Sequence, residues 1–225
     1  MKKLLIYLSI LCFVICTCQS KKEEAHKNNK TSTMVEKFDF ALFKKYQESN
    51  GTLELKNGYT VLSMSAPEKD EAGTLEELLP KPSFLYVYKE FYPNGNLNKK
   101  ETRISETVKV EKSEYYDKNG NLEKTVDEDQ NYGKIKYQDV LNFLDKKGYI
   151  NLKTGAGRLN DDGTNKYDIV YDQDIPVWNI MIMQGKRLSE KELMEIMKTS
   201  PGEPSAWKPV VYQMDANTGK IISEK

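Results

Sequence analysis

Cysteine and histidine are almost absent from this sequence, and the few that occur are confined to its start. The three cysteines are Cys12, Cys16 and Cys18, and the only histidine is His26, in a chain of 225 residues. The residues after position 26 therefore cannot supply a disulfide, a cysteine nucleophile, a Cys/His zinc site or a Ser-His-Asp arrangement. We expect no metal, no cofactor and no enzymatic activity.

An excess of charge of either sign is also missing. The sequence holds 34 basic and 34 acidic residues. Without Lys2 and Lys3, which belong to the basic start of the chain, 32 basic residues remain against 34 acidic ones, a net charge of −2. A nucleic-acid partner favours a basic surface. The balance therefore argues against nucleic-acid binding.

The apolar run near the start is too short to span a membrane. Met1-Lys2-Lys3 followed by the apolar residues 4–14 is typical of a secretory signal peptide. The run ends near Cys18, short of the roughly 20 residues that a membrane-spanning helix needs. One alternative is that all three cysteines belong to a signal peptide that is removed by ordinary cleavage.

The other alternative is lipidation. Ile15-Cys16-Thr17-Cys18 places an aliphatic residue three positions before Cys18 and a small residue just before it, and so resembles a lipobox. The resemblance implies a lipoprotein signal peptide over residues 1–17. It also implies acyl chains such as palmitate on Cys18, which would anchor the protein in the outer membrane.

The residues after Cys18 contain almost nothing to bury. Residues 19–35 are mostly Lys, Glu, Asn, Ser and Thr, which predicts a disordered tether over residues 18–36. About 17 residues of coil reach on the order of 20–25 Å. Gln19-Ser20-Lys21-Lys22-Glu23-Glu24 resembles a signal that sends some lipoproteins to the cell surface, although a solvated tether has the same composition. A periplasmic and a surface location both remain open.

Two segments between positions 91 and 125 repeat one pattern. Residues 91–100 read Phe-Tyr-Pro-Asn-Gly-Asn-Leu-Asn-Lys-Lys, and residues 115–124 read Tyr-Tyr-Asp-Lys-Asn-Gly-Asn-Leu-Glu-Lys. The two Asn-Gly pairs lie 25 residues apart. Asn-Gly supplies the positive φ angles of a tight hairpin turn, so each segment predicts a hairpin.

These two copies resemble the MORN-variant repeat, which consists of an aromatic pair, an Asn-Gly turn, a leucine and charged residues. Such repeats occur in bacterial surface proteins and in proteins described as antitoxins, so the resemblance implies a binding or scaffold role. Two copies are fewer than the three or more that usually support themselves. The rest of the chain must complete their core.

The residues around these copies predict a β-rich domain over residues 37–130. We expect a short helix within residues 35–46, a hairpin over residues 53–62, and a central strand over residues 84–92. Thr74-Leu75-Glu76-Glu77 fits the capping box of a brief helix.

The pattern of the sequence changes after position 130. Residues 131–225 predict a second domain, of the α+β class. One helix is predicted by the spacing of Tyr137, Val140, Leu141 and Leu144. Strands are expected over residues 167–171 and 177–183. A second helix should begin at a capping box of Ser189 with Glu192, and its buried stripe should be Leu193, Ile196 and Met197.

The final segment predicts a hairpin of residues 210–214 with residues 220–222. Its strand ends in Asp215-Ala216 and its turn carries Thr218-Gly219-Lys220, so it resembles the closing hairpin of PepSY-type domains. That resemblance implies a small envelope module that restrains or binds other proteins. The whole chain is expected to be α+β, with antiparallel strands and two helices in its second half.

Aromatic residues are the remaining candidates for a functional site. Exposed tyrosines combine a large contact area with a polar tip, so they suit a protein or glycan partner. The candidates are Tyr86, Tyr88, Tyr92, Tyr115 and Tyr116. They could equally be cross-strand pairs that stabilise the sheet. Trp178, Trp207 and the methionines at positions 181, 183, 194, 197 and 214 are expected in the core.

Catalytic patterns are weak. The adjacent acids Asp127-Glu128-Asp129 are typical of a solvated loop. Ser205-Ala206-Trp207-Lys208 matches the S-x-x-K of penicillin-binding acyl-enzymes, but Pro204 and Pro209 flank it and disfavour the helix that this motif needs. We therefore expect a lipid-anchored envelope protein that binds a protein partner, in its sharpest form an immunity or inhibitor protein against a toxin. A glycan-binding or structural surface lipoprotein is the alternative.

Overall fold

The computed structural model describes residues 35–160, 164–199 and 205–225. The expected signal peptide, the acylation site Cys18, His26 and the expected tether up to residue 34 lie outside the described residues. None of the helices within the described ranges combines the length and the hydrophobicity that a membrane-spanning helix requires.

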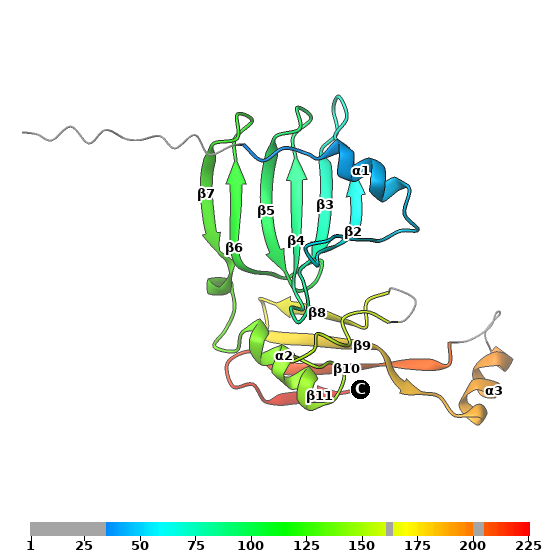
Figure 1. Ribbon diagram of the computed structural model, residues 1–225. Coiled ribbons are helices and arrows are strands. Elements are labelled where there is room, and N and C mark those ends of the chain that lie inside the picture. Colours follow the sequence, from blue (N-terminus) through cyan, green and yellow to red (C-terminus); the bar gives the residue numbers. More distant parts are fainter. Residues whose placement is uncertain (1–34, 161–163, 200–204) are drawn as a thin grey trace, which may run out of the picture. The chain divides into compact units, whose positions relative to one another are not determined.

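The first half of the described chain forms a seven-stranded antiparallel sheet in which each strand pairs with its neighbour in sequence (Figure 1). The strands are β1 (Leu53–Glu54), β2 (Thr60–Ser65), β3 (Gly73–Leu78), β4 (Tyr86–Phe91), β5 (Leu97–Arg103), β6 (Lys109–Tyr116) and β7 (Leu122–Asp127). Helix α1 (Phe40–Gln47) precedes them, and the Asp39 side chain caps it by accepting the Leu42 N–H at 2.9 Å.

The second half forms a four-stranded antiparallel sheet in the order β11-β10-β9-β8. Its strands are β8 (Tyr167–Asp172), β9 (Val177–Arg187), β10 (Trp207–Asp215) and β11 (Ile221–Glu224). A 3-10 turn η1 (Glu128–Asn131) and helix α2 (Tyr137–Lys146) come before this sheet, and helix α3 (Glu190–Thr199) lies between β9 and β10. The predicted α+β class with a β-rich first half is confirmed.

The two Asn-Gly hairpins of the repeats have the same geometry. The Gly95 N–H donates to the Tyr92 carbonyl at 2.8 Å, and the Gly120 N–H donates to the Asp117 carbonyl at 2.9 Å. Only the glycines have positive φ, +82° and +83°. The left-handed conformation, predicted for the Asn-Gly pair, is therefore supplied by the glycine alone.

The two repeats are bound to each other through these tips. The Asn94 and Asn96 side-chain amides both donate to the Lys118 carbonyl, at 2.9 and 2.8 Å. The chain before α1 also pairs with the first tip, because the Phe38 N–H donates to the Gly95 carbonyl at 2.8 Å. The short array is therefore completed by residues from outside the repeats.

The helix predicted at Thr74–Glu77 is wrong, because these residues belong to β3. Leu75 pairs with Met64 of β2 and with Lys89 of β4, so β3 is hydrogen-bonded on both sides. The Thr74 hydroxyl lies 2.8 Å from that of Ser65 across the strands and does not cap a helix. Pairing with two neighbouring strands overrides a short helical signal.

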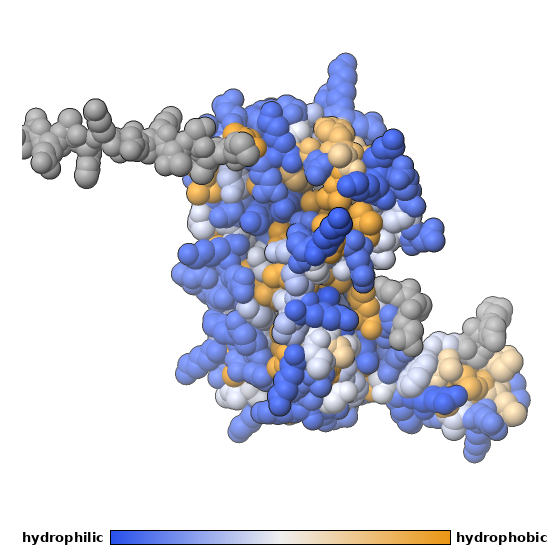
Figure 2. All heavy atoms as spheres, in the orientation of Figure 1, coloured by the Kyte–Doolittle hydropathy of each residue, from blue (hydrophilic) through white to orange (hydrophobic). Residues whose placement is uncertain are grey.

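The capping box of α3 is confirmed, but its predicted buried stripe is wrong. The Ser189 N–H donates to Glu192 Oε2 at 2.8 Å. No residue of α3 is buried, and Met194 and Met197 are 60 % and 58 % exposed. The strand register explains the exposure of α3. β8 ends opposite Ile182, and beyond that point β9 and β10 continue as a two-stranded ribbon, which carries α3. Figure 2 shows the apolar side chains of α3 at the surface.

Of the tryptophans and methionines that were predicted to lie in the core, likewise only some are buried. Trp178 is fully buried, whereas Trp207, on the ribbon that carries α3, is exposed. Of the five methionines expected in the core, Met214 is buried, Met183 is half-buried, and Met181, Met194 and Met197 are exposed. Trp207, Met194 and Met197 belong to the ribbon and to α3, which have no covering layer among the described residues. Met181 pairs with Asp168 and Val211 within the four-stranded sheet and points to the side opposite the buried Ile180 and Ile182.

Two apolar cores hold the fold together. The smaller one lies under α1 and contains Phe38, Val61, Met64, Leu75, Phe91 and Leu97. The larger one combines Ile104, Val108 and Val110 of the first half with Val140 and Leu144 of α2 and with the inner face of the four-stranded sheet. The boundary predicted at residue 130 falls between β7 and α2, but the larger core draws on residues from both sides of it.

Candidate functional site

Strand register sorts the side chains of the seven-stranded sheet onto two faces. Tyr86 pairs with Arg103, Tyr88 with Glu101 and Glu90 with Lys99. Cross-strand partners point to the same side of a sheet, and alternate residues share that side. We define the tyrosine face as the side that carries Glu76, Tyr86, Tyr88, Glu90, Lys99, Glu101, Arg103, Lys109, Tyr115 and Lys124.

The opposite face is the one covered by α1 and by the chain before it. Val61, Leu75 and Phe91 lie on that side in the core under α1. Lys89, on the same side, forms ion pairs with Glu36 at 2.7 Å and with Glu77 at 3.3 Å. The covered side therefore combines an apolar core under α1 with its own charged pairs, whereas the tyrosine face has no helix of the described chain packed on it.

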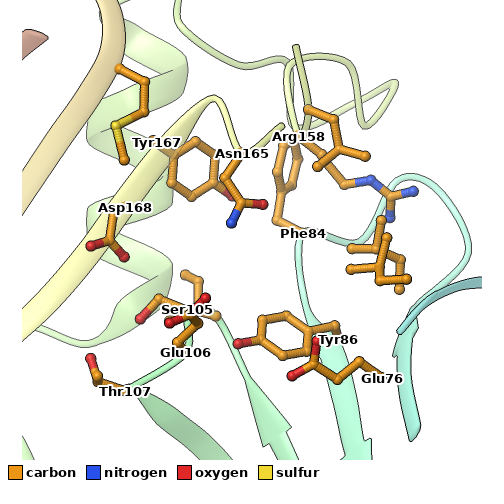
Figure 3. Close-up of a pocket in the computed structure, with 15 residues that line it drawn as sticks. Glu76, Phe84, Tyr86, Ser105, Glu106, Thr107, Arg158, Asn165, Tyr167 and Asp168 are labelled. Carbon is orange, nitrogen blue, oxygen red and sulfur yellow. The ribbon is translucent and has the colours of Figure 1, made fainter. Parts of the chain in front are cut away.

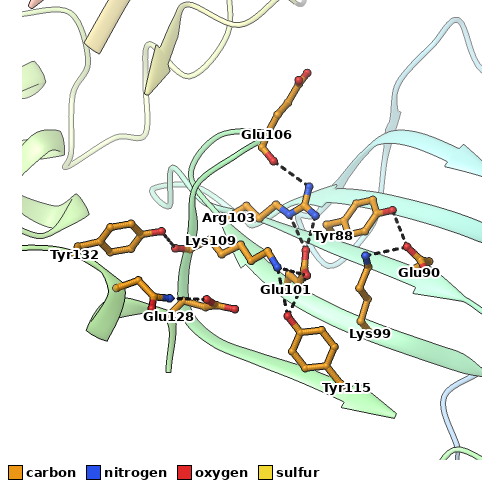
Figure 4. A network of polar contacts seen from close by, with 11 residues as sticks. Tyr88, Glu90, Lys99, Glu101, Arg103, Glu106, Lys109, Tyr115, Glu128 and Tyr132 are labelled. Atoms are coloured by element: carbon orange, nitrogen blue, oxygen red, sulfur yellow. Dashed lines mark hydrogen bonds and ion pairs between the residues drawn. The ribbon is translucent and has the colours of Figure 1, made fainter. Parts of the chain in front are cut away.

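Glu101 is the buried centre of the tyrosine face (Figure 4). It is 1 % exposed, and its carboxylate accepts hydrogen bonds from the Arg103 guanidinium and lies 2.8 Å from Lys109 Nζ. Burial alone would raise the pKa of Glu101, but the hydrogen bonds and positive charges of Lys109 and Arg103 hold it below the usual glutamate range. The carboxylate is therefore fixed in its charged form.

Cations lie over the two tyrosine rings that flank this centre. The Arg103 guanidinium is 4.0 Å from the centroid of the Tyr88 ring, and Lys99 Nζ is 5.4 Å from it. Lys109 and Lys124 lie 5.9 and 5.8 Å from the centroid of Tyr115. Such contacts orient both partners. The aromatic and basic groups of this face are therefore held in place before any partner arrives.

The structure brings together three of the five candidate tyrosines. Tyr86, Tyr88 and Tyr115 lie on the tyrosine face. Tyr92 donates its hydroxyl hydrogen bond to the Tyr116 carbonyl at 2.7 Å, which links the two repeats.

Tyr116 packs against the core under α1 and donates to Glu114 Oε2 at 2.8 Å. Burial, together with the Glu114 carboxylate, raises the pKa of Tyr116 to about 12. Tyr116 therefore lies on the covered side of the sheet, away from the other candidates.

A pocket of about 240 Å³ opens where the tyrosine face meets the four-stranded sheet (Figure 3). Glu76, Tyr86 and Phe84 line it from the first sheet and its loop, and Tyr167 and Asp168 line it from β8. The Ser105 hydroxyl, also in the lining, donates to the Ile169 carbonyl and ties the two sheets together at this point.

The acidic run after β7 has a structural role. The Asp127 side chain accepts the Asp129 N–H at the start of η1, at 3.3 Å. Asp129 Oδ1 accepts the Glu111 N–H at 3.3 Å, and Glu128 is buried. Within residues 35–160, 164–199 and 205–225, no group of three or more His, Cys, Asp or Glu side chains is arranged to hold a metal ion.

Reasoning from the sequence missed the charged part of the site. Lys99, Glu101 and Arg103 alternate along β5, which is the usual pattern of a solvated strand face. The same spacing of two occurs at Tyr86 and Tyr88 on the neighbouring strand. Pairing the two patterns would have indicated a joint tyrosine and arginine surface.

Comparison with known proteins gives no relative, since no family model, no curated protein and no solved structure matches the chain.

Proposed function

We propose that this protein is a non-enzymatic binding module of the bacterial envelope, which captures a protein partner on its tyrosine face. The observation that carries the proposal is the network around Glu101, in which Arg103 and Lys109 are fixed beside Tyr88 and Tyr115. Tyrosine and arginine, together with tryptophan, are enriched among the residues that contribute most to binding energy at protein interfaces.

Pre-organisation is the physical advantage of this face. Ordering a long side chain at an interface costs about 0.5–1.5 kcal/mol. Here Arg103 is already held by Glu101 and stacked on Tyr88, so much of that cost is met when the protein folds. A partner that presents carboxylates and apolar groups would meet donors and rings in fixed positions.

The sharper form of the proposal is an immunity or inhibitor protein, anchored in the outer membrane by a lipid on Cys18, that blocks a toxin. The antitoxin association of MORN-variant repeats and the lipobox-like Ile15-Cys16-Thr17-Cys18 motivate it. Inhibition of this kind predicts tight capture of one partner at one-to-one stoichiometry.

Polysaccharide binding is the alternative, and the tyrosine face supports it less well. Sugars stack on open aromatic rings, whereas cations already lie over Tyr88 and Tyr115. Under this alternative, polysaccharide binding would weaken when Tyr86 or Tyr92 becomes Ala.

The proposal is tested by capturing partners from native envelope and secreted fractions with residues 19–225 made without the lipid. Captured proteins are cross-linked and identified by mass spectrometry. The double variant Tyr88→Ala with Lys124→Glu removes one ring and reverses one charge on the tyrosine face. Lys45→Glu, on α1, is the matched charge control on the covered side.

One stoichiometric partner that is lost with the double variant and retained with Lys45→Glu would support the proposal. Equal capture by both variants would refute the tyrosine face as the binding surface. Binding of polysaccharide in the absence of any protein partner would favour the alternative.

A further inference from the structure

The pocket beside Tyr86 has a size and a lining that suit a single side chain. Its volume of about 240 Å³ lies just below the roughly 300–1,000 Å³ of pockets that hold drug-sized ligands. Figure 3 shows Phe84 and Tyr167 on one side of the space and Tyr86 with Glu76 on the other. An alkyl chain that enters would therefore pass between aromatic rings.

The charge inside this pocket is negative. Glu76, Glu106 and Asp168 line it, and none of these carboxylates forms an ion pair within the described residues. Glu76 accepts a hydrogen bond from the Ser63 hydroxyl at 3.0 Å and has no ion-pair partner among the described residues.

The one cation of the lining is already engaged. Arg158 Nη1 donates to the backbone carbonyls of Leu79 and Ser83, at 2.6 and 2.7 Å. In Figure 3 its guanidinium lies beyond Phe84, on the side away from Tyr167 and Asp168. The positive charge of Arg158 therefore does not neutralise the carboxylates across the pocket.

A second observation concerns the hydroxyl of Tyr167. Tyr167 is 8 % exposed and lines the pocket, yet its hydroxyl has no hydrogen-bond partner among the residues described. The hydroxyl oxygen is not one of the fully buried atoms without a partner, so it is open to the space of the pocket. The hydroxyl therefore has an acceptor position available to whatever fills the space.

We propose that this pocket receives the ammonium or guanidinium group of a lysine or arginine side chain of the captured protein. The inference rests on the proposed function and adds the chemistry of one anchor residue in the partner. The cation would lie between the Tyr86 and Phe84 rings, in the negative potential of Glu76 on one side and Asp168 on the other, and the Tyr167 hydroxyl would be available as an acceptor.

The test uses small cations on residues 19–225 and needs no partner. n-Butylammonium and n-butylguanidinium are titrated against the ¹⁵N-labelled protein, with n-butanol and butyrate as neutral and anionic controls. We expect the amide signals of Tyr86, Asn165 and Tyr167 to shift, with a Kd on the order of 1–10 mM for the cations. The controls should bind at least ten times more weakly.

Two variants remove the charge without removing the pocket. Glu76→Gln and Asp168→Asn together should weaken binding of n-butylammonium at least fivefold, whereas Glu54→Gln, on the exposed strand β1, should leave it unchanged. Butanol that binds as well as butylammonium, or cation binding that survives the double variant, would overturn the proposal.

Failure of the pocket can be told apart from failure of the proposed function. A partner captured on the tyrosine face by a protein that binds neither cation would refute the pocket alone. Undiminished capture of that partner by the Glu76→Gln, Asp168→Asn variant would refute its assignment as the site of an anchor residue.

Discussion

The Glu101 carboxylate lies 2.8 Å from the Lys109 ammonium, although Glu101 is almost completely buried. Arg103 completes the arrangement, and both cations keep some contact with solvent. The cost of burying the carboxylate is offset by these two partners. This relationship links the stability of the fold to the surface on which we propose that a partner binds.

Glu101→Gln should therefore destabilise the protein. Removing one member of a fully buried ion pair costs about 3–5 kcal/mol. Because Lys109 and Arg103 are partly exposed and can be hydrated, we expect about 1–3 kcal/mol. Urea unfolding at pH 7 measures the loss, and Glu54→Gln, at an exposed position, should change stability by less than about 0.5 kcal/mol. Equal effects of both substitutions would contradict a structural role for the network.

The same carboxylate predicts a dependence on acid. The pKa of Glu101 is lowered in the folded protein, so its stabilising contribution is present above the unfolded value of about 4.3 and is lost as the pH falls through the folded pKa. The difference in unfolding free energy between wild type and Glu101→Gln should be constant from pH 7 to 5 and should shrink below about pH 4. Unfolding at pH 7, 5, 4 and 3 tests this, and a difference that stays constant down to pH 3 would contradict it.

Local signals predicted most of the strands and helices. The spacing of Tyr137, Val140, Leu141 and Leu144 identified α2, because all four side chains are buried against the sheet in the structure. The Asn-Gly tips located two hairpins, because a glycine with positive φ is needed there. These features depend on residues close together in the sequence.

The errors concern features that depend on distant residues. Thr74–Glu77 became a strand because β2 and β4 lie on either side of it. The apolar stripe of α3 is typical of a buried helix, but the ribbon of β9 and β10 carries it to a place without a covering layer. The Glu101 network and the pocket were not predicted for the same reason. Each brings together residues of several strands, and the register of those strands cannot be read from the sequence.

The shared core predicts that the two halves unfold together. Leu144, on α2, belongs to one cluster with Val108 and Val110 of the first half. Leu144→Ala should cost about 2–5 kcal/mol. Native-state hydrogen exchange should show the same decrease in protection for the amides of β5 and β6 as for those of β9. If protection fell in β9 alone, the halves would be independent domains divided near residue 130.

The last prediction concerns how the chain before α1 is held. Gly120 and Gly95 occupy equivalent turns with φ of +83° and +82°, but a Cβ on Gly120 would lie 2.2 Å from Val35 Cγ1, whereas a Cβ on Gly95 would meet nothing within 4 Å. Alanine at either position should cost about 1–2 kcal/mol for the left-handed backbone.

Gly120→Ala should lose about 1 kcal/mol more than Gly95→Ala, because Val35 must move. Val35→Ala in the Gly120→Ala background should remove that extra loss, and a double-mutant cycle by urea unfolding measures the coupling. A coupling near zero would mean that Val35 does not pack on the second repeat.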